Sequence, residues 1–154
     1  MGYSMTTPAG TGFDLNGWWH ERVQATMEAC QMTRGETIGR QDGLSIENFL
    51  DQGGAISEAE CTAAVAAWDS LNGPAKLAAR GLMEERARPN HDDDRIGSAW
   101  LTAQQDRVRT LATVPSAGCD RYKPRSTPDG MWAGWDEWIA FLRQAAAEGG
   151  FSVQ

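Results

Sequence analysis

Two histidines are the residues of this chain best suited to acid–base chemistry. His20 and Glu21 directly follow a pair of tryptophans, Trp18 and Trp19. An imidazole beside an aromatic platform could act as a general acid or base toward a sugar or a nucleobase. Neighbouring residues of a helix do not face each other, so His20 and Glu21 cannot form a catalytic pair by themselves. We expect His20 to lie at the edge of an amphipathic helix.

The second histidine begins the acidic run from His91 to Asp94. Carboxylates and an imidazole are ligands for Mg²⁺, Mn²⁺ or Zn²⁺, but adjacent residues rarely converge on one ion. The same acids precede an expected helix, where each negative charge stabilises the helix dipole by about 0.3–1 kcal/mol. We therefore predict a capping role for this run, with no metal site and no cofactor.

The segment from Phe49 to Glu60 resembles the calcium-binding loop of EF-hand proteins. Gly54, Ile56 and Glu60 stand at its turn, hydrophobic and bidentate positions. The first and fifth positions hold Phe49 and Gly53, whose side chains offer no oxygen, so we expect no calcium binding. The sequence holds no serine elbow, phosphate loop, pair of zinc histidines or dinucleotide fingerprint.

Acidity is concentrated in the first half of the chain. The 154 residues include 21 acidic and 14 basic ones, a net charge of −7. Residues 1–72 hold ten acidic and three basic residues, whereas residues 73–154 hold eleven of each. Solubility is the simplest explanation for such a charge, but an acidic surface also repels nucleic acid and anionic membrane and favours basic proteins. We predict these partner-binding residues: Trp18, Glu21, Glu28, Glu36, Asp42, Glu47 and Asp51.

The stretch from Thr127 to Phe151 is the element around which we expect the others to pack. Its apolar residues recur at helical spacing, and Trp135 and Trp138 lie on the same face. Each aromatic side chain buries roughly 150–250 Å², so this face predicts a central core helix, with a partner-binding face as the alternative. Gly149 and the glycine after it predict a left-handed stop.

Other helices are expected over residues 17–34, 57–71, 74–88 and 94–113, with one or two helical turns over residues 45–50. Ser57 and Glu60 have the spacing of a capping box, and Pro74 suits the first turn of the next helix. A long loop is expected over residues 115–129. Residues 1–12 are small and polar and predict a disordered, flexible lead-in. We therefore predict an all-α fold, a single helical domain over residues 13–154 forming a bundle of about five helices.

The cysteines predict a reducing compartment. Cys30, Cys61 and Cys119 are odd in number and widely spaced, which is not the pattern of a disulfide framework and fits the cytoplasm. No apolar run approaches the roughly twenty residues that a membrane-spanning helix needs.

These observations favour a non-enzymatic binding or inhibitory protein that presents an acidic helical surface to a basic partner protein. In size and charge the chain is similar to accessory proteins of phages and mobile elements, among them anti-CRISPR and anti-restriction inhibitors that cover a nucleic-acid-binding surface with carboxylates. The alternative is a small helical hydrolase that uses His20 or His91 with nearby carboxylates. A helix-turn-helix regulator around Gly73 is a third hypothesis, weakened by the few basic residues that follow it.

Overall fold

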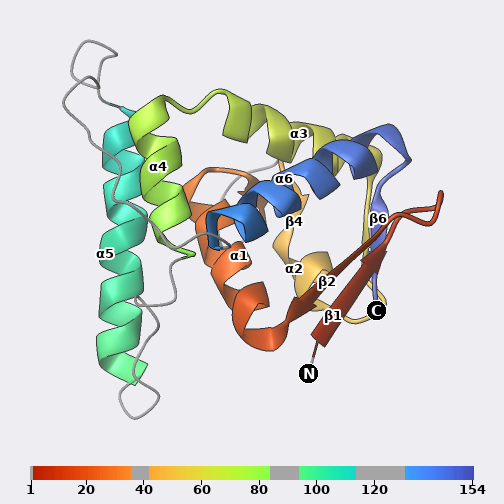
Figure 1. Ribbon diagram of the computed structural model, residues 1–154, viewed down its shortest axis with the longest axis horizontal. Helices are drawn as coiled ribbons and strands as arrows, with labels where there is room; N and C mark the ends of the chain where they lie inside the picture. Colours follow the sequence, from red (N-terminus) through yellow and green to blue (C-terminus); the bar gives the residue numbers. More distant parts are fainter. Residues whose placement is uncertain (1, 36–41, 84–93, 114–130) are drawn as a thin grey trace.

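The computed structural model describes residues 2–35, 42–83, 94–113 and 131–154, without the side chains of residues 16–19, 94–100 and 131–133. Figure 1 shows helices packed on one side of a small sheet. The strands are β1 (Gly2–Thr6), β2 (Gly12–Asn16), β3 (Thr33–Arg34), β4 (Leu44–Ser45), β5 (Ala55–Ile56) and β6 (Phe151–Val153). The helices are α1 (Gly17–Ala29), α2 (Ile46–Leu50), α3 (Glu58–Asp69), α4 (Gly73–Gly81), α5 (Asp94–Ala112) and α6 (Met131–Ala147).

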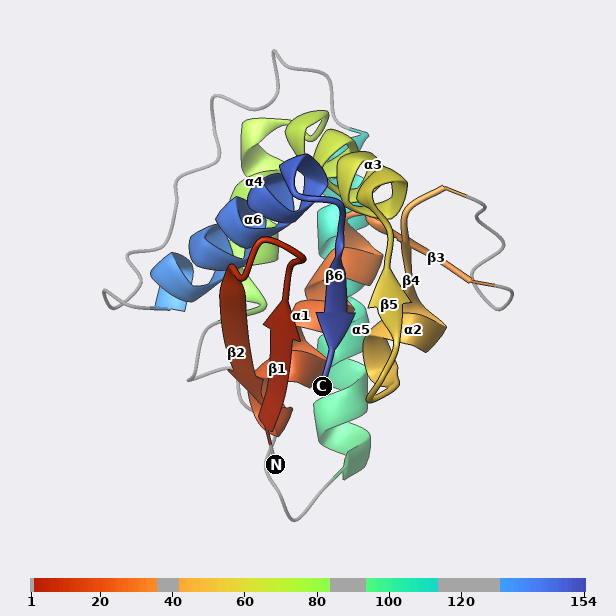
Figure 2. The ribbon, with the colours of Figure 1, turned by 90° about the vertical axis from the view of Figure 1, so that its right-hand side faces the viewer.

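The fold is mixed α/β, and the expected all-α bundle is wrong. Four strands form an antiparallel sheet in the order β2-β1-β6-β5, and β3 pairs with β4 in a separate parallel pair. Strand β1 lies inside the larger sheet, between β2 and β6 (Figure 2). The disordered N-terminal lead-in that we expected is therefore also wrong, because β1 pairs with β2 along residues 2–6 and with β6 at Met5 and Thr6.

Alternation of side chains explains why these short segments are strands. Met5 of β1 and Leu15 of β2 are buried, whereas the residues that precede them, Ser4 and Asp14, face solvent. Apolar residues that alternate with polar ones give a strand one core face and one solvent face. Helices α1 and α6 lie behind the core face of the sheet in Figure 2.

Helix α1 lies at the centre of the fold. Among its residues 20–29, every side chain is buried except those of Glu21, Gln24 and Glu28. It ends earlier than the expected residue 34, because Gln31 adopts a left-handed φ of 62° and Met32 N–H donates to the Met27 carbonyl at 3.0 Å. That hydrogen bond caps the C-terminus of the helix, and the chain continues as β3 from Thr33.

Helix α6 confirms the predicted tryptophan-rich core helix. Trp135 and Trp138 are completely buried, and Trp138 packs edge-on against Phe151 of β6 with 6.0 Å between ring centroids. The helix ends at the predicted glycines: Gly149 and Gly150 have φ near 93° and 92°, and Gly150 N–H donates to the Ala145 carbonyl at 2.7 Å. The residues after Gly150 form β6 and do not extend the helix.

The remaining helix starts follow the sequence signals. Ser57 and Glu60 form the predicted capping box of α3, and Asn72 caps α4 with Pro74 in the first turn. Helix α2 begins where expected, after Ser45. Helices α3 and α6 pack along each other, and α4 packs beside α5 (Figure 1). The expected loop over residues 115–129 lies outside the described residues.

Candidate functional site

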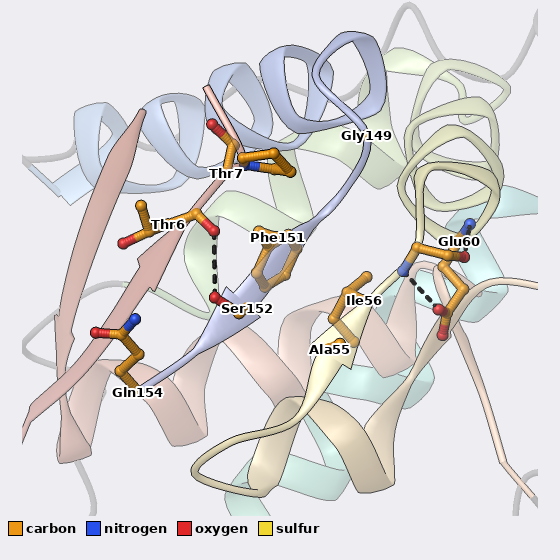
Figure 3. A pocket seen from close by; sticks show the side chains of 11 residues that line it. Thr6, Thr7, Ala55, Ile56, Glu60, Gly149, Phe151, Ser152 and Gln154 are labelled. Atoms are coloured by element: carbon orange, nitrogen blue, oxygen red, sulfur yellow. Dashed lines mark hydrogen bonds between the residues drawn. The ribbon is translucent and has the colours of Figure 1, made fainter. Parts of the chain in front are cut away.

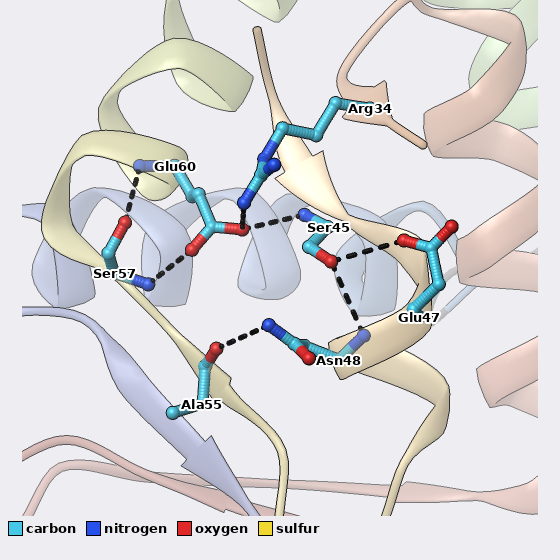
Figure 4. A network of polar contacts seen from close by, with 7 residues as sticks. All are labelled: Arg34, Ser45, Glu47, Asn48, Ala55, Ser57 and Glu60. Carbon is cyan, nitrogen blue, oxygen red and sulfur yellow. Dashed lines mark hydrogen bonds and ion pairs between the residues drawn. The ribbon is translucent and has the colours of Figure 1, made fainter. Parts of the chain in front are cut away.

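A network around the Glu60 carboxylate holds α2 and β4 against the start of α3 (Figure 4). Oε1 of Glu60 accepts hydrogen bonds from Ser45 N–H at 2.9 Å and from Arg34 at 3.1 Å. Oε2 accepts from Ser57 N–H at 2.7 Å. Burial alone would raise the pKa of Glu60, but these donors together hold the pKa below its ordinary value of 4.5. Glu60 is thus a structural carboxylate that fixes the segment before α2.

Three acids and one leucine are exposed along the segment from Asp42, just before β4, to Asp51, just after α2. We call Asp42, Glu47, Leu50 and Asp51 the α2 surface; all four are exposed. Leu50, at 42%, is the exposed large hydrophobic side chain among the described residues. The sequence does not indicate that Leu50 is exposed, because one apolar residue at the end of a short helix carries no signal of exposure. The α2 surface therefore combines three of the predicted partner-binding acids with one exposed apolar side chain.

The other predicted partner-binding residues lie elsewhere. Glu21 is exposed on α1, and Glu28 on the same helix is half-buried and accepts a hydrogen bond from Gln24 at 3.1 Å. The Trp18 side chain and residue Glu36 lie outside the described part of the chain. The structure thus divides the predicted acidic surface between α1 and α2.

Within the described residues, most acids of the first half have no ion pair. The two that do are Glu60, which pairs with Arg34, and Asp69, which pairs with Arg143. In the second half, Asp106 pairs with Arg109 and Asp136 with Arg80, whereas Glu137 and Glu148 form no ion pair with a described residue. Seven acids of the first half form no ion pair with a described residue: Asp14, Glu21, Glu28, Asp42, Glu47, Asp51 and Glu58.

His20 is buried in the core and not at the edge of a helix as expected. Its side chain is 1% exposed and lies between the rings of Tyr3 and Phe49. Nε2 lies 3.2 Å from the Phe49 carbonyl, which only accepts, so Nε2 carries the proton. Burial lowers the pKa of His20 more than this hydrogen bond raises it. A neutral, enclosed imidazole that contacts no carboxylate of the described residues does not fit the alternative hydrolase. His91 lies outside the described residues.

A hollow of about 430 Å³ opens on the solvent side of the sheet, between the end of β1 and the start of α3 (Figure 3). Its polar groups include the hydroxyls of Thr6, Ser57 and Ser152, and Ile56 and Phe151 provide apolar contacts. Glu60 is the carboxylate among the lining residues, which include no histidine, cysteine or lysine. Because that carboxylate already accepts three hydrogen bonds, the hollow offers no free acid–base pair.

The described residues include only some of the positions for which the sequence predicted the absence of a metal site and of disulfide bonds. No group of histidine, cysteine or acidic residues within the described ranges is arranged to hold a metal ion. In the loop that resembles an EF-hand, the Glu60 carboxylate accepts hydrogen bonds from Ser45 N–H and Ser57 N–H. Cys30 and Cys61 are buried free thiols, and burial raises the pKa of each to about 12. Cys119 lies outside the described residues, as do residues 91–93 of the acidic run.

Comparison with known proteins found no family model, no curated protein and no solved structure that matches the chain. Among the described helices, none is both long enough and apolar enough to cross a membrane.

Proposed function

We propose that this chain is a non-enzymatic binding protein whose acidic surface docks onto a basic surface of a partner protein. The observation that carries the proposal is the exposed acidic surface of the first half, where seven of the nine described acids form no ion pair with a described residue. The exposed carboxylates Glu21, Glu47 and Asp51 on or beside α1 and α2 are among these seven. In the second half, Asp106 and Asp136 are paired within the chain and supply matched control positions.

Unpaired carboxylates of one sign favour association with a basic partner for a simple electrostatic reason. They repel one another in the free protein, and lysine or arginine side chains of a partner relieve that repulsion. Complementary charge also raises the rate of association and excludes partners of the wrong sign. The same argument disfavours nucleic acid and anionic membrane as direct partners.

Leu50 gives the α2 surface a place for apolar contact. Interfaces concentrate their binding energy in buried apolar or aromatic side chains surrounded by polar residues that exclude water. Leu50 is 42% exposed, with the exposed acids Glu47 and Asp51 on the same short helix or at its end. Burial of Leu50 under a partner would add a hydrophobic contribution to the charge attraction.

The cellular setting that we propose is a reducing cytoplasm, supported by the two free thiols. Within that setting, an inhibitor of the phage or mobile-element kind, of anti-CRISPR or anti-restriction type, is the class that size and charge support. Such an inhibitor would compete with nucleic acid for a basic protein surface.

The proposal is tested by capture of partners from a lysate of the source organism at low and high salt. The wild type is compared with Glu47→Gln/Asp51→Asn and with a control, Asp106→Asn/Asp136→Asn, which removes the same charge from ion-paired positions. We expect the first variant to lose a salt-sensitive partner and the control to keep it. Equal capture by all three proteins, or no salt-sensitive partner, would contradict the proposal.

A further inference from the structure

The two edges of the larger sheet differ: described residues contact one of them, and no described strand pairs with the outer side of the other. At the β5 edge, Asn48 of α2 donates a side-chain hydrogen bond to the Ala55 carbonyl at 3.2 Å. Strand β2 forms the other edge, and β1 is its partner among the described strands. In Figure 2, β2 is the outermost strand on the left of the sheet.

Hydrogen bonds along β1 show which way its backbone groups point. Ser4 N–H donates to the Gln154 carbonyl at 3.2 Å, and Ser4 C=O accepts from Gln154 N–H at 2.8 Å. Backbone groups of successive residues point to opposite sides of an antiparallel strand. Because Ser4 points toward β6, Tyr3 and Met5 point toward β2.

The same alternation identifies the free groups of β2. Leu15 and Phe13 lie opposite Tyr3 and Met5, so their backbone groups bond to β1. The backbone N–H and C=O groups of Gly12 and Asp14 therefore point away from β1, and no backbone hydrogen bond joins them to another described residue. Natural edge strands are often protected by lysine, proline or a bulge; the β2 sequence holds neither lysine nor proline.

Each face of β2 has its own chemistry. On the solvent face, Asp14 accepts a hydrogen bond from Ser4 Oγ at 2.7 Å and has no ion pair with a described residue. On the core face, the half-buried ring of Phe13 lies 5.4 Å from that of Phe141 on α6. Glu137 is exposed one turn before Phe141, on the same side of α6. A strand added at this edge would meet carboxylates and an aromatic ring.

We propose that the free edge of β2 binds an extended segment of the basic partner by strand addition, and that basic and apolar residues alternate in this segment. Residues directly opposite Gly12 and Asp14 share their solvent face, where a basic side chain meets Asp14. Residues opposite Phe13 face the core side, where an apolar side chain meets its ring. The inference rests on the proposed function, because it takes the partner to be basic.

A second copy of the chain is a poorer occupant of the same edge. Full antiparallel pairing of two β2 strands through their outward groups would centre on Asp14. The two Asp14 side chains would then lie opposite each other, and like charges in such a pair destabilise it. Dimerisation of the free protein through β2, measured by analytical ultracentrifugation, would overturn the proposal.

The first test uses a fluorescent peptide of alternating lysine and valine as the probe. Asp14→Pro removes an outward N–H without removing a bond to β1, and Asp14→Asn keeps the N–H but removes the charge. We expect Asp14→Pro to weaken peptide binding about tenfold. Asp14→Asn should weaken it about threefold at low salt and not at high salt. Equal binding by wild type and Asp14→Pro would overturn the proposal.

The second test keeps the wild-type protein and so does not depend on how Asp14→Pro folds. Two further peptides are used. The first is N-methylated at the backbone of every lysine and the second at the backbone of every valine, so each peptide lacks the backbone N–H donors along one of its two edges. Antiparallel addition predicts loss of binding for the lysine-methylated peptide alone, because the residues opposite Asp14 bond to it. Parallel addition predicts loss for the valine-methylated peptide alone. If the two N-methylated peptides bind equally well, or lose binding to the same extent, strand addition is overturned.

The two proposals fail in different ways. If Glu47→Gln/Asp51→Asn loses the captured partner while Asp14→Pro keeps it, the acidic docking function stands and strand addition is wrong. If the peptide binds at β2 but no salt-sensitive partner is captured, the edge site stands and the docking function on α2 is wrong.

Discussion

The ring of Tyr3 stacks on the imidazole of His20, with 3.8 Å between ring centroids and 14° between ring planes. Phe49 stacks on the other face of the imidazole, at 4.2 Å and 12°. One side chain of α1 thus joins β1 to α2. Because Phe49 belongs to the same helix as Leu50 and Glu47, this stack helps to fix the α2 surface against the core.

Stability is expected to fall in weak acid because of His20. Burial holds the pKa of His20 below 6.5 in the folded protein, so the unfolded chain binds the proton more readily. The free energy of unfolding therefore decreases as pH falls from about 6.5 toward the folded pKa, and this contribution then levels off. Urea unfolding at several pH values measures the slope. His20→Phe retains an aromatic ring without a titrating proton, and a wild-type slope in this variant would contradict the assignment.

The Glu60 network is expected to contribute more stability than a simple helix cap. Glu60→Ala leaves the N–H groups of Ser45 and Ser57 without their acceptor and should lower the free energy of unfolding by about 1–3 kcal/mol. Glu58→Ala is the control, because Glu58 is exposed in the same helical turn. Since the pKa of Glu60 lies below 4.5, its contribution is present above that pH and is lost as pH falls through the folded pKa. Equal effects of both substitutions in chemical denaturation would count against this role.

The two glycines after α6 are expected to differ in their tolerance of a side chain. Both have a left-handed φ, which costs an alanine roughly 1–2 kcal/mol. A Cβ on Gly149 would meet Pro8 at 3.7 Å, an ordinary contact, whereas a Cβ on Gly150 would collide with the Ile56 carbonyl. Gly150→Ala should therefore lower the melting temperature well beyond Gly149→Ala. Similar melting temperatures for the two variants would show that β5 does not press against Gly150.

The core thiols are expected to be inert until the protein unfolds. Burial raises the pKa of Cys30 and of Cys61 to about 12, so almost no thiolate is present near neutral pH. In a Cys119→Ser background, a thiol reagent such as Ellman's should react with neither cysteine in the native protein and with both in urea. Fast reaction of either thiol in the native state would place it outside the core.

Local signals in the sequence determined the helices and several of their ends. The capping box at Ser57, the turn at Pro74 and the apolar face of α6 each depend on residues within a few positions of one another. Such short-range contacts are readable because helix hydrogen bonds and caps are themselves local. The concentration of acid in the first half was equally visible.

The sheet was decided by contacts between distant parts of the chain. Tyr3 and Met5, like Phe13 and Leu15, do alternate with polar residues, but each run is too short to distinguish a strand from a loop. Met5 pairs in register with Val153, almost the whole chain away. No local pattern can predict that pairing, because it depends on α6 returning the chain to β1.

The candidate sites divide in the same way. Composition identified the acidic surface, whereas tertiary structure decided that Glu60 is used internally, that Leu50 is exposed and that His20 is enclosed. It also left the outward groups of Gly12 and Asp14 without a strand partner among the described residues. The physical reason is that residue type sets charge and hydrophobicity, but only packing determines which groups find partners within the fold and which remain available to another molecule.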